Sequence, residues 1–227
     1  MPKMQRKPKP KPWRVRKERP EEYLGRPEFY YTEDEIKRYS GSTGVRMAQE
    51  RIAERICGFL DLAGKGKILD LGCGPGYTAS WIIGQGHDVV GLDLLPGMLE
   101  KASEKGIKTI KADMRRFSDK LKGQEFDAVI SASALQWIKK SQGLASVAGE
   151  IFCVLKENGK CVIQFYPQSS EEMEKVLRVF RSQGLEGEAK VLNADDPRKR
   201  EVYLILRKKA EKGKKNLKSR SKPKQGD

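Results

Sequence analysis

The sequence predicts an α/β fold in which helices cover both faces of a mostly parallel sheet and the last strand runs antiparallel. Short apolar segments alternate with helical segments through most of the chain, a pattern typical of parallel strands joined by right-handed crossovers. This alternation stops near the end, where only "ADDPRKR" (residues 194–200) separates two apolar segments. That connection is too short for a crossover helix, so the last strand is expected to run antiparallel to its neighbour.

Two helical segments are expected before the first strand. Residues 32–62 are predicted to form two helical segments, broken at Ser40-Gly41-Ser42, that close over the end of the sheet carrying the Gly-rich loop described below. Apolar residues of the second segment recur at helical spacing. They are Ile52, Ile56, Phe59 and Leu60.

Seven strands and four further helices are expected to follow. The helix ends are marked by Gly84 and Gly86, by Pro96 and Gly106, and by Asn158-Gly159, which are residues typical of helix starts and C-caps. The expected strands are residues 68–71, 87–93, 107–113, 126–133, 160–166, 188–193 and 201–206. The expected helices are residues 77–86, 95–106, 143–159 and 171–184.

The positive charge is concentrated at the two ends of the chain. Residues 1–20 contain nine Lys and Arg against one Glu, and residues 207–227 contain ten against one Glu and one Asp. Both segments have too few apolar residues to fold independently, so we expect basic disordered tails around a domain at residues 21–206. The tails are predicted to bind a polyanion, since each Lys or Arg placed on a phosphate releases counterions. The alternative is that their charge serves only solubility.

Composition excludes several classes of protein. No apolar run approaches the roughly 18 residues of a membrane span, and no hydrophobic segment follows the basic N-terminus as in a secretory signal. The four cysteines are far apart, which fits reduced thiols in a cytoplasmic protein, or a nuclear or nucleolar one if the source is eukaryotic. His87 is the only histidine, so neither a zinc site nor a Ser-His-Asp triad is expected.

A Gly-rich loop joins the first strand to its helix. It reads Asp70-Leu71-Gly72-Cys73-Gly74-Pro75-Gly76, and an acidic residue, Asp93, ends the next strand. Glycines allow a tight turn and close approach to a ligand, and a carboxylate at that spacing accepts hydrogen bonds from ribose hydroxyls. The loop therefore predicts a nucleoside-containing ligand.

The details of the loop favour S-adenosylmethionine over a dinucleotide. Its spacing is G-x-G-x-G, Pro75 removes an amide that a phosphate could use, and Asp70 suits an ammonium group. After the third strand, Asp113 is predicted to accept from the adenine amino group and Met114 to pack beside the ring. The alternative for Asp113 is that it only caps the turn before Arg115.

These residues resemble class I S-adenosylmethionine-dependent methyltransferases. The resemblance rests on "ILDLGCGPG", "GLDLLPGML", "KADM", "FDAVISASALQW" and "VLKENGKCVIQFYP". More narrowly, "RPEFYYTEDEIKRY", "SASALQW", "QFYP" and "NADDPRKREVYLIL" resemble the small-subunit ribosomal RNA (guanine-N7) methyltransferases, over roughly residues 26–206. "SGSTGVRM" does not align cleanly with the family pattern, so no residue role is carried onto it.

The resemblance implies a Rossmann-like sheet of seven strands with a reversed last strand. It also implies a partner, a small zinc-binding activator protein that forms a heterodimer with the enzyme, and roles in ribosomal RNA methylation, rRNA processing and ribosome biogenesis. Residues that match the family's cofactor contacts are Gly72, Gly74, Asp93, Leu94, Asp113, Met114 and Ser131.

The segment "VISASALQW" (residues 129–137) has no ionisable side chain where many related enzymes carry an acid, amide or base. The N7 atom of guanine has a lone pair outside the aromatic sextet, so in-line transfer to N7 requires positioning rather than a general base. Trp137 and Tyr166 are predicted to stack on a flipped purine. Each could instead be an aromatic of the core or rim.

Two other functions remain open at the level of sequence. A methyltransferase acting on quinone precursors or lipids would share the Gly-rich loop, although the basic tails and "SASALQW" count against it. A ribosome-assembly factor would keep the cofactor fold and use its tails for docking, with binding more important than catalysis.

Overall fold

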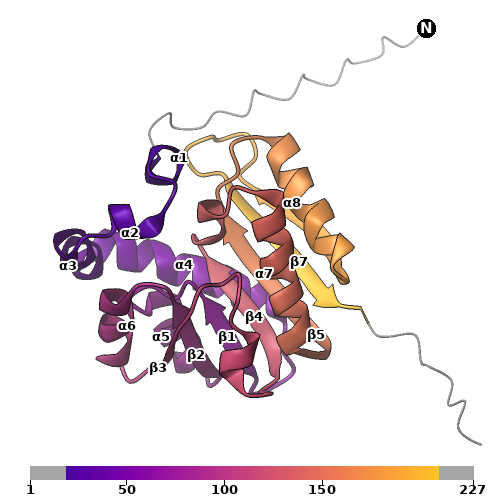
Figure 1. The fold of residues 1–227 in the computed structure, drawn as a ribbon, viewed down its shortest axis with the longest axis horizontal. Coiled ribbons are helices and arrows are strands. Elements are labelled where there is room, and N and C mark those ends of the chain that lie inside the picture. The colour runs from indigo at the N-terminus through magenta and orange to yellow at the C-terminus, as the bar shows by residue number, and fades with distance from the viewer. Residues whose placement is uncertain (1–18, 210–227) are drawn as a thin grey trace, which may run out of the picture.

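The computed structural model describes residues 19–209 (Figure 1). The predicted tails, residues 1–20 and 207–227, lie outside the described residues except at 19–20 and 207–209. The helices are α1 (Pro20–Tyr23), α2 (Pro27–Tyr30), α3 (Glu33–Gly41), α4 (Thr43–Leu60), α5 (Tyr77–Gly84), α6 (Pro96–Ser103), α7 (Ser141–Val154) and α8 (Ser170–Ser182), with 3₁₀ turns at Ser118–Leu121 and Leu135–Trp137. The strands are β1 (Lys67–Leu71), β2 (Asp88–Asp93), β3 (Lys108–Lys111), β4 (Phe126–Ala132), β5 (Leu155–Phe165), β6 (Leu185–Leu192) and β7 (Glu201–Lys208).

The seven strands form one sheet in the order β3-β2-β1-β4-β5-β7-β6. Strands β1 to β5 run parallel to one another, whereas β7 lies between β5 and β6 and is antiparallel to both. This confirms the predicted Rossmann-like sheet and its reversed last strand. The position of β7 between β5 and β6 was not evident from the sequence.

Two apolar clusters cover the two faces of the sheet. One contains buried residues of α4, α5 and α6, and the other contains buried residues of α7, α8 and the 3₁₀ turn at Ser118–Leu121. Consecutive strand residues contribute to opposite clusters, as Ile68 and Leu69 of β1 do, because side chains alternate across a strand. Figure 1 shows the resulting arrangement of helices around the central sheet.

The predicted break between the N-terminal helices is confirmed. Ser42 separates α3 from α4 and caps α4, since its side chain accepts a hydrogen bond from the backbone N–H of Val45. Thr32 caps α3 in the same way through the N–H of Glu35. The short helices α1 and α2, each of which begins with a proline, were not predicted.

The predicted helix at residues 143–159 is wrong at its end. Helix α7 stops at Val154, and Leu155 already has an extended backbone and pairs with Phe126 of β4. Leu155 is completely buried, so its side chain gains more from packing in the sheet core than from one further helical turn. Asn158 adopts a left-handed φ of 60° inside β5, where the register with β4 shifts, instead of closing a helix.

Candidate functional site

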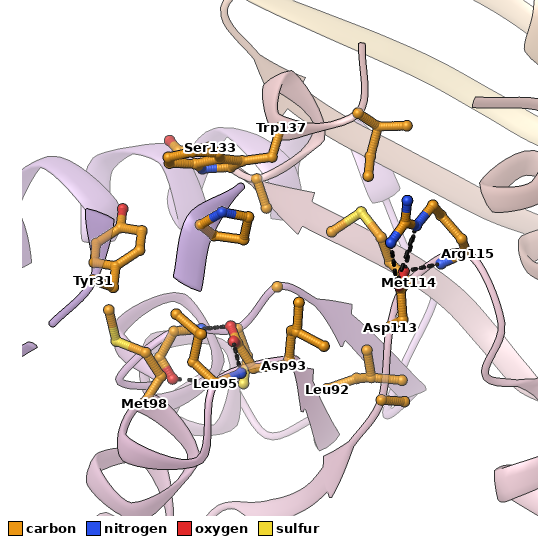
Figure 2. Close-up of a pocket in the computed structure, with 18 of the residues that line it drawn as sticks. Tyr31, Leu92, Asp93, Leu95, Met98, Asp113, Met114, Arg115, Ser133 and Trp137 are labelled. Atoms are coloured by element: carbon orange, nitrogen blue, oxygen red, sulfur yellow. Dashed lines mark hydrogen bonds and ion pairs between the residues drawn. The ribbon is translucent and has the colours of Figure 1, made fainter. Parts of the chain in front are cut away.

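A cavity of about 670 Å³ lies at the carboxyl end of the parallel strands. The loops after β1, β2, β3 and β4 form one part of its wall, and residues of α2, α3 and α4 form another. Strand order reverses here, since β2 and β4 lie on opposite sides of β1, and such a switch point is where open α/β sheets bind ligands. Figure 2 shows Tyr31, Asp93, Met114 and Trp137 around this space.

The Gly-rich loop is held close to both neighbouring strands. The backbone N–H groups of Gly72 and Cys73 both donate to the carbonyl of Leu92, and the N–H of Gly74 donates to Asp93 Oδ2 at 2.9 Å. Gly72 has a φ of 72°, and a β-carbon there would lie 2.4 Å from Cβ of Ala134. Only glycine permits this contact between the loop and the segment after β4.

Asp70 is a buried carboxylate that faces the cavity without a partner. The residue is 1% exposed, and among the described residues neither carboxylate oxygen has a hydrogen-bond donor. Burial, and then the nearby charge of Asp93, raises its pKa to about 7. A ligand that brings a cationic group or a hydrogen-bond donor would satisfy these oxygens, because an unpaired buried carboxylate is costly.

Asp93 ends β2 and is oriented by two backbone amides. Its oxygens accept from the N–H groups of Gly74 and Leu95, each at 2.9 Å. Burial raises the pKa of this carboxyl, and these backbone hydrogen bonds oppose the rise. Each carboxylate oxygen has more than one lone pair, so Asp93 can still accept from ligand hydroxyls. Leu94, Leu95 and Met98 extend the wall of the cavity beside it.

Asp113 and Met114 both line the cavity, but the carboxylate of Asp113 is engaged by Arg115. Its carboxylate accepts from the backbone N–H of Arg115 at 2.8 Å and from the guanidinium of the same residue (Figure 2). The Arg115 guanidinium lowers the pKa of this carboxyl. The turn-capping alternative therefore describes the hydrogen bonding in the structure, and the adenine contact stays a prediction.

Ser131 does not line the cavity. Its residue is 2% exposed, and its hydroxyl donates to the carbonyl of Leu71 at 2.8 Å, where it ties β4 to β1. The next three residues, Ala132, Ser133 and Ala134, line the cavity instead. None of them can serve as a strong acid or base, as the sequence indicated.

The two predicted aromatic residues are separated. Trp137 lines the cavity, whereas Tyr166 lies outside its wall, with the Arg19 guanidinium 5.4 Å from its ring centre. The aromatic neighbour of Trp137 that lines the cavity is Tyr31, which lies between α2 and α3. Tyr31 lies 6.1 Å from Trp137 and 5.7 Å from Tyr39, measured between ring centres.

Sequence reasoning did not single out Tyr31, Tyr39, Gln49 or Ser133. The signal available was the aromatic-rich segment "RPEFYYTEDEIKRY", which carried part of the family resemblance. Local pattern does not show which of its aromatics face inward. Their position depends on how α3 and α4 pack over the loop, with the hydroxyl of Tyr77 donating to the carbonyl of Ser40.

Other chemistries find little support in the described part of the chain. Residues 19–209 contain no group of three or more His, Cys, Asp and Glu placed to hold a metal ion. Cys73 lines the cavity, but burial raises the pKa of its thiol well above the usual range, which disfavours the nucleophilic thiolate. No helix within the same residues is long and apolar enough to cross a membrane.

Comparison with known proteins relates the chain to methyltransferases. A family model described as "Methyltransferase domain" matches residues 69–163. The 18S rRNA (guanine-N(7))-methyltransferase bud23 of Schizosaccharomyces pombe is 30% identical over 197 residues, which cover 82% of this chain and 73% of that protein. The 18S rRNA (guanine(1575)-N(7))-methyltransferase of Saccharomyces cerevisiae is 33% identical over 190 residues, covering 79% and 67%.

Solved structures share the fold at lower identity. The PH0226 protein of Pyrococcus horikoshii OT3 matches with a TM-score of 0.62 and 20% identity, covering 75% of this chain and 93% of that chain. The magnesium protoporphyrin IX methyltransferase ChlM of Synechocystis PCC 6803, crystallised with bound S-adenosylmethionine, matches with a TM-score of 0.63 and 13% identity, covering 86% and 100%.

Proposed function

Because this chain belongs to the family of 18S rRNA (guanine-N7)-methyltransferases, we propose that it methylates N7 of a guanine in small-subunit ribosomal RNA. The observation that carries this proposal, besides the family, is the composition of the cavity. It combines a Gly-rich loop and two buried carboxylates with a wall of small residues, Ala132 to Ala134, that holds no general base. N7 methylation is a transfer for which no base is needed.

The residues present fit S-adenosylmethionine, the cofactor of this enzyme class. The unpaired Asp70 carboxylate suits its ammonium group, and Asp93 suits its ribose hydroxyls. Leu94, Met98 and Met114 also line the cavity and would offer apolar contacts to a purine ring. When bound, the cofactor would supply a methyl group carried on a sulfonium, and the rest of the cofactor would be the leaving group, a neutral thioether.

The chain's own contribution is to orient the guanine and exclude water. Tyr31, Tyr39 and Trp137 form an aromatic wall that can hold a base beside the small residues after β4. Holding the base in line with the methyl group makes the transfer effectively unimolecular. This gain from proximity and orientation is the main source of rate acceleration available in this cavity. The stacking role proposed for Trp137 rests on its place in this wall.

Ribosomal RNA binding is proposed to involve the mouth of the cavity and the basic tails. Arg26, Lys139 and Lys140 line the cavity and are exposed to solvent. The tails at residues 1–20 and 207–227, on either side of the proposed domain at 21–206, add charge that would act on the phosphate backbone. Such contacts give affinity, whereas selection of the base falls to the cavity.

A small zinc-binding activator protein is proposed as a heterodimer partner. The enzyme is proposed to act on ribosome precursors in the cytoplasm, or in the nucleolus of a eukaryote. Support for the partner comes from the family resemblance and from β3, which forms one edge of the sheet. An edge strand leaves backbone groups that another chain can pair with. Co-purification of such a protein with the full chain would test this.

The function is tested by incubating the full chain, with and without the activator, with labelled S-adenosylmethionine and small-subunit ribosomal RNA. Label should enter the RNA, and chemical cleavage specific for N7-methylguanine should map it to one position. Asp93→Ala should lose cofactor binding and labelling together. Label confined to small molecules would contradict the proposal and favour a small-molecule methyltransferase.

A further inference from the structure

Two exposed aromatic side chains lie in the segment that borders the mouth of the cavity. Among residues 19–209, the exposed large apolar or aromatic side chains are Tyr23 (67% exposed), Phe29 (63%), Met47 (52%) and Ile83 (39%). The two most exposed, Tyr23 and Phe29, belong to residues 19–30, here called the rim segment, which carries α1 and α2 (Figure 1). Single exposed apolar residues are ordinary, so the position of these two rings has to show whether they have a use.

Polar contacts hold the first half of the rim segment against the mouth. Glu22 forms an ion pair with Lys139, which lines the cavity, and accepts from Gln168 Nε2 at 2.7 Å. The Arg19 guanidinium donates at 2.8 Å to a backbone carbonyl in the same loop, between β5 and α8. Tyr23 directly follows Glu22, so its backbone is fixed beside the mouth while most of its side chain is in solvent.

Phe29 lies next to the cavity wall in the second half of the rim segment. Arg26 and Glu28 line the cavity, and consecutive Cα atoms are about 3.8 Å apart, so Phe29 is at the edge of this wall. The ring of Tyr31 lies 6.1 Å from that of Trp137, between ring centres, whereas the Phe29 ring is largely in solvent. The two exposed rings therefore flank the stretch of chain that forms this side of the mouth.

The charges at the mouth are close to balanced. The cations that line the cavity are Arg26, Arg115, Lys139 and Lys140. Two of them, Arg115 and Lys139, are already paired with carboxylates, and Glu28 places a further carboxylate in the same wall. Little net positive charge is left to attract phosphates, so contacts with bases have to supply part of the affinity for RNA at this point.

A target base in the cavity fixes where its neighbours lie. The nucleotides on either side of an extruded base are joined to it through the backbone, so they lie at the mouth. In a single strand their bases present flat faces on which aromatic side chains stack, whatever the sequence. The two rings are separated by exposed polar residues, Arg26 and Glu28, which fits a nucleic acid better than the continuous apolar centre of a protein interface.

We propose that Tyr23 and Phe29 are stacking platforms for the RNA bases that flank the target guanine. The inference rests on the proposed function, which places the guanine in the cavity between them. The basic segment at residues 1–20 precedes Tyr23 almost directly. The charge that attracts the RNA backbone and the ring that receives a base are thus neighbours along the chain.

The test removes a ring and a base in turn. Tyr23→Ala and Phe29→Ala are prepared in the full chain, together with Tyr23→Phe, which keeps a ring. Ile83→Ala is the matched control, because Ile83 is exposed at the end of α5 that precedes β2, at the amino ends of the strands and away from the cavity. The ligands are a single-stranded oligonucleotide around the guanine that wild type methylates, and two versions with an abasic site directly before or after that guanine.

Affinities are measured by fluorescence anisotropy over a range of salt concentrations. Tyr23→Ala and Phe29→Ala should each weaken binding of the intact oligonucleotide by about fivefold or more, the loss expected for one stacked base. Each loss should disappear on the oligonucleotide that lacks the stacked base. Tyr23→Phe and Ile83→Ala should bind as wild type does. The salt dependence should stay the same in every variant, because no charge is removed, and so should the affinity for S-adenosylmethionine.

The possible failures are distinguishable. If wild type transfers no methyl group to small-subunit ribosomal RNA, the proposed function fails. If wild type is active but both alanine variants bind the intact oligonucleotide normally, or lose equally on intact and abasic RNA, only the stacking platforms are refuted. Loss of the co-purifying activator protein at unchanged RNA affinity would also refute them, and would assign the exposed rings to a protein partner.

Discussion

Replacement of Gly72 by alanine tests how the Gly-rich loop is built. The new β-carbon would lie 2.4 Å from Cβ of Ala134, and the φ of 72° disfavours any side chain. A left-handed alanine costs about 1–2 kcal/mol, and overpacking of a tight contact costs a further 1–3 kcal/mol or so. Gly72→Ala should therefore lower the free energy of unfolding by about 2–5 kcal/mol.

Gly74→Ala is the matched control within the same loop. Gly74 also has a positive φ, 53°, but a β-carbon there would meet no atom within 4 Å. Only the backbone cost should remain, about 1–2 kcal/mol. Urea unfolding of both variants without ligand gives the two free energies, and calorimetric titration gives their affinities for S-adenosylmethionine. Both affinities should fall, because the loop lines the cavity.

A compensating variant isolates the clash. Ala134→Gly removes the atom that the new β-carbon meets, so it should recover the overpacking part of the Gly72→Ala loss and leave the backbone part. The double-mutant cycle should show a coupling of about 1–3 kcal/mol between the two positions. Equal losses for Gly72→Ala and Gly74→Ala, with no coupling to Ala134, would refute the close packing described here.

Further predictions concern the carboxylate, the aromatic wall and the tails. The folded-state pKa of Asp70, about 7, exceeds its unfolded value, so the ligand-free chain should lose stability as pH rises from about 4 to 7. Urea unfolding across that range should show a smaller loss for Asp70→Asn, and an equal loss would contradict the assignment. Trp137→Ala should reduce RNA methylation without changing the affinity for the cofactor. Tyr166→Ala should reduce methylation less, because Tyr166 lies outside the cavity wall. Equal methylation rates for the two variants would contradict the role of Trp137 in the aromatic wall. Deletion of residues 1–18 and 210–227 should weaken RNA binding and flatten its salt dependence, measured by filter binding, without changing cofactor affinity. An unchanged salt slope would show that the tails do not contact RNA.

The Gly-rich loop and Asp93 could be predicted from sequence because their spacing encodes local geometry. In a parallel sheet, the glycine turn that follows one strand and the acidic residue that ends the next strand both lie at the carboxyl ends of the strands. The end of the helix at residues 143–159 was wrong, because Asn158-Gly159 is a helix-ending signal that occurs here inside β5. Burial of Leu155 in the sheet outweighed that local preference.

Sequence patterns therefore determined the succession of strands and helices along the chain and the reversed last strand. They also determined the Gly-rich loop and the resemblance to the methyltransferase family. Tertiary structure decided which aromatics face the cavity, because Tyr31 lies beside Trp137, and Tyr39 beside Tyr31, only once α3 packs against α4 and α6. It also decided that the side chain of Ser133 is hydrogen-bonded to those of Gln164 and Gln49, which lie 31 and 84 positions away. A hydrogen bond between such distant residues depends on which groups the fold brings together, and no local pattern records that.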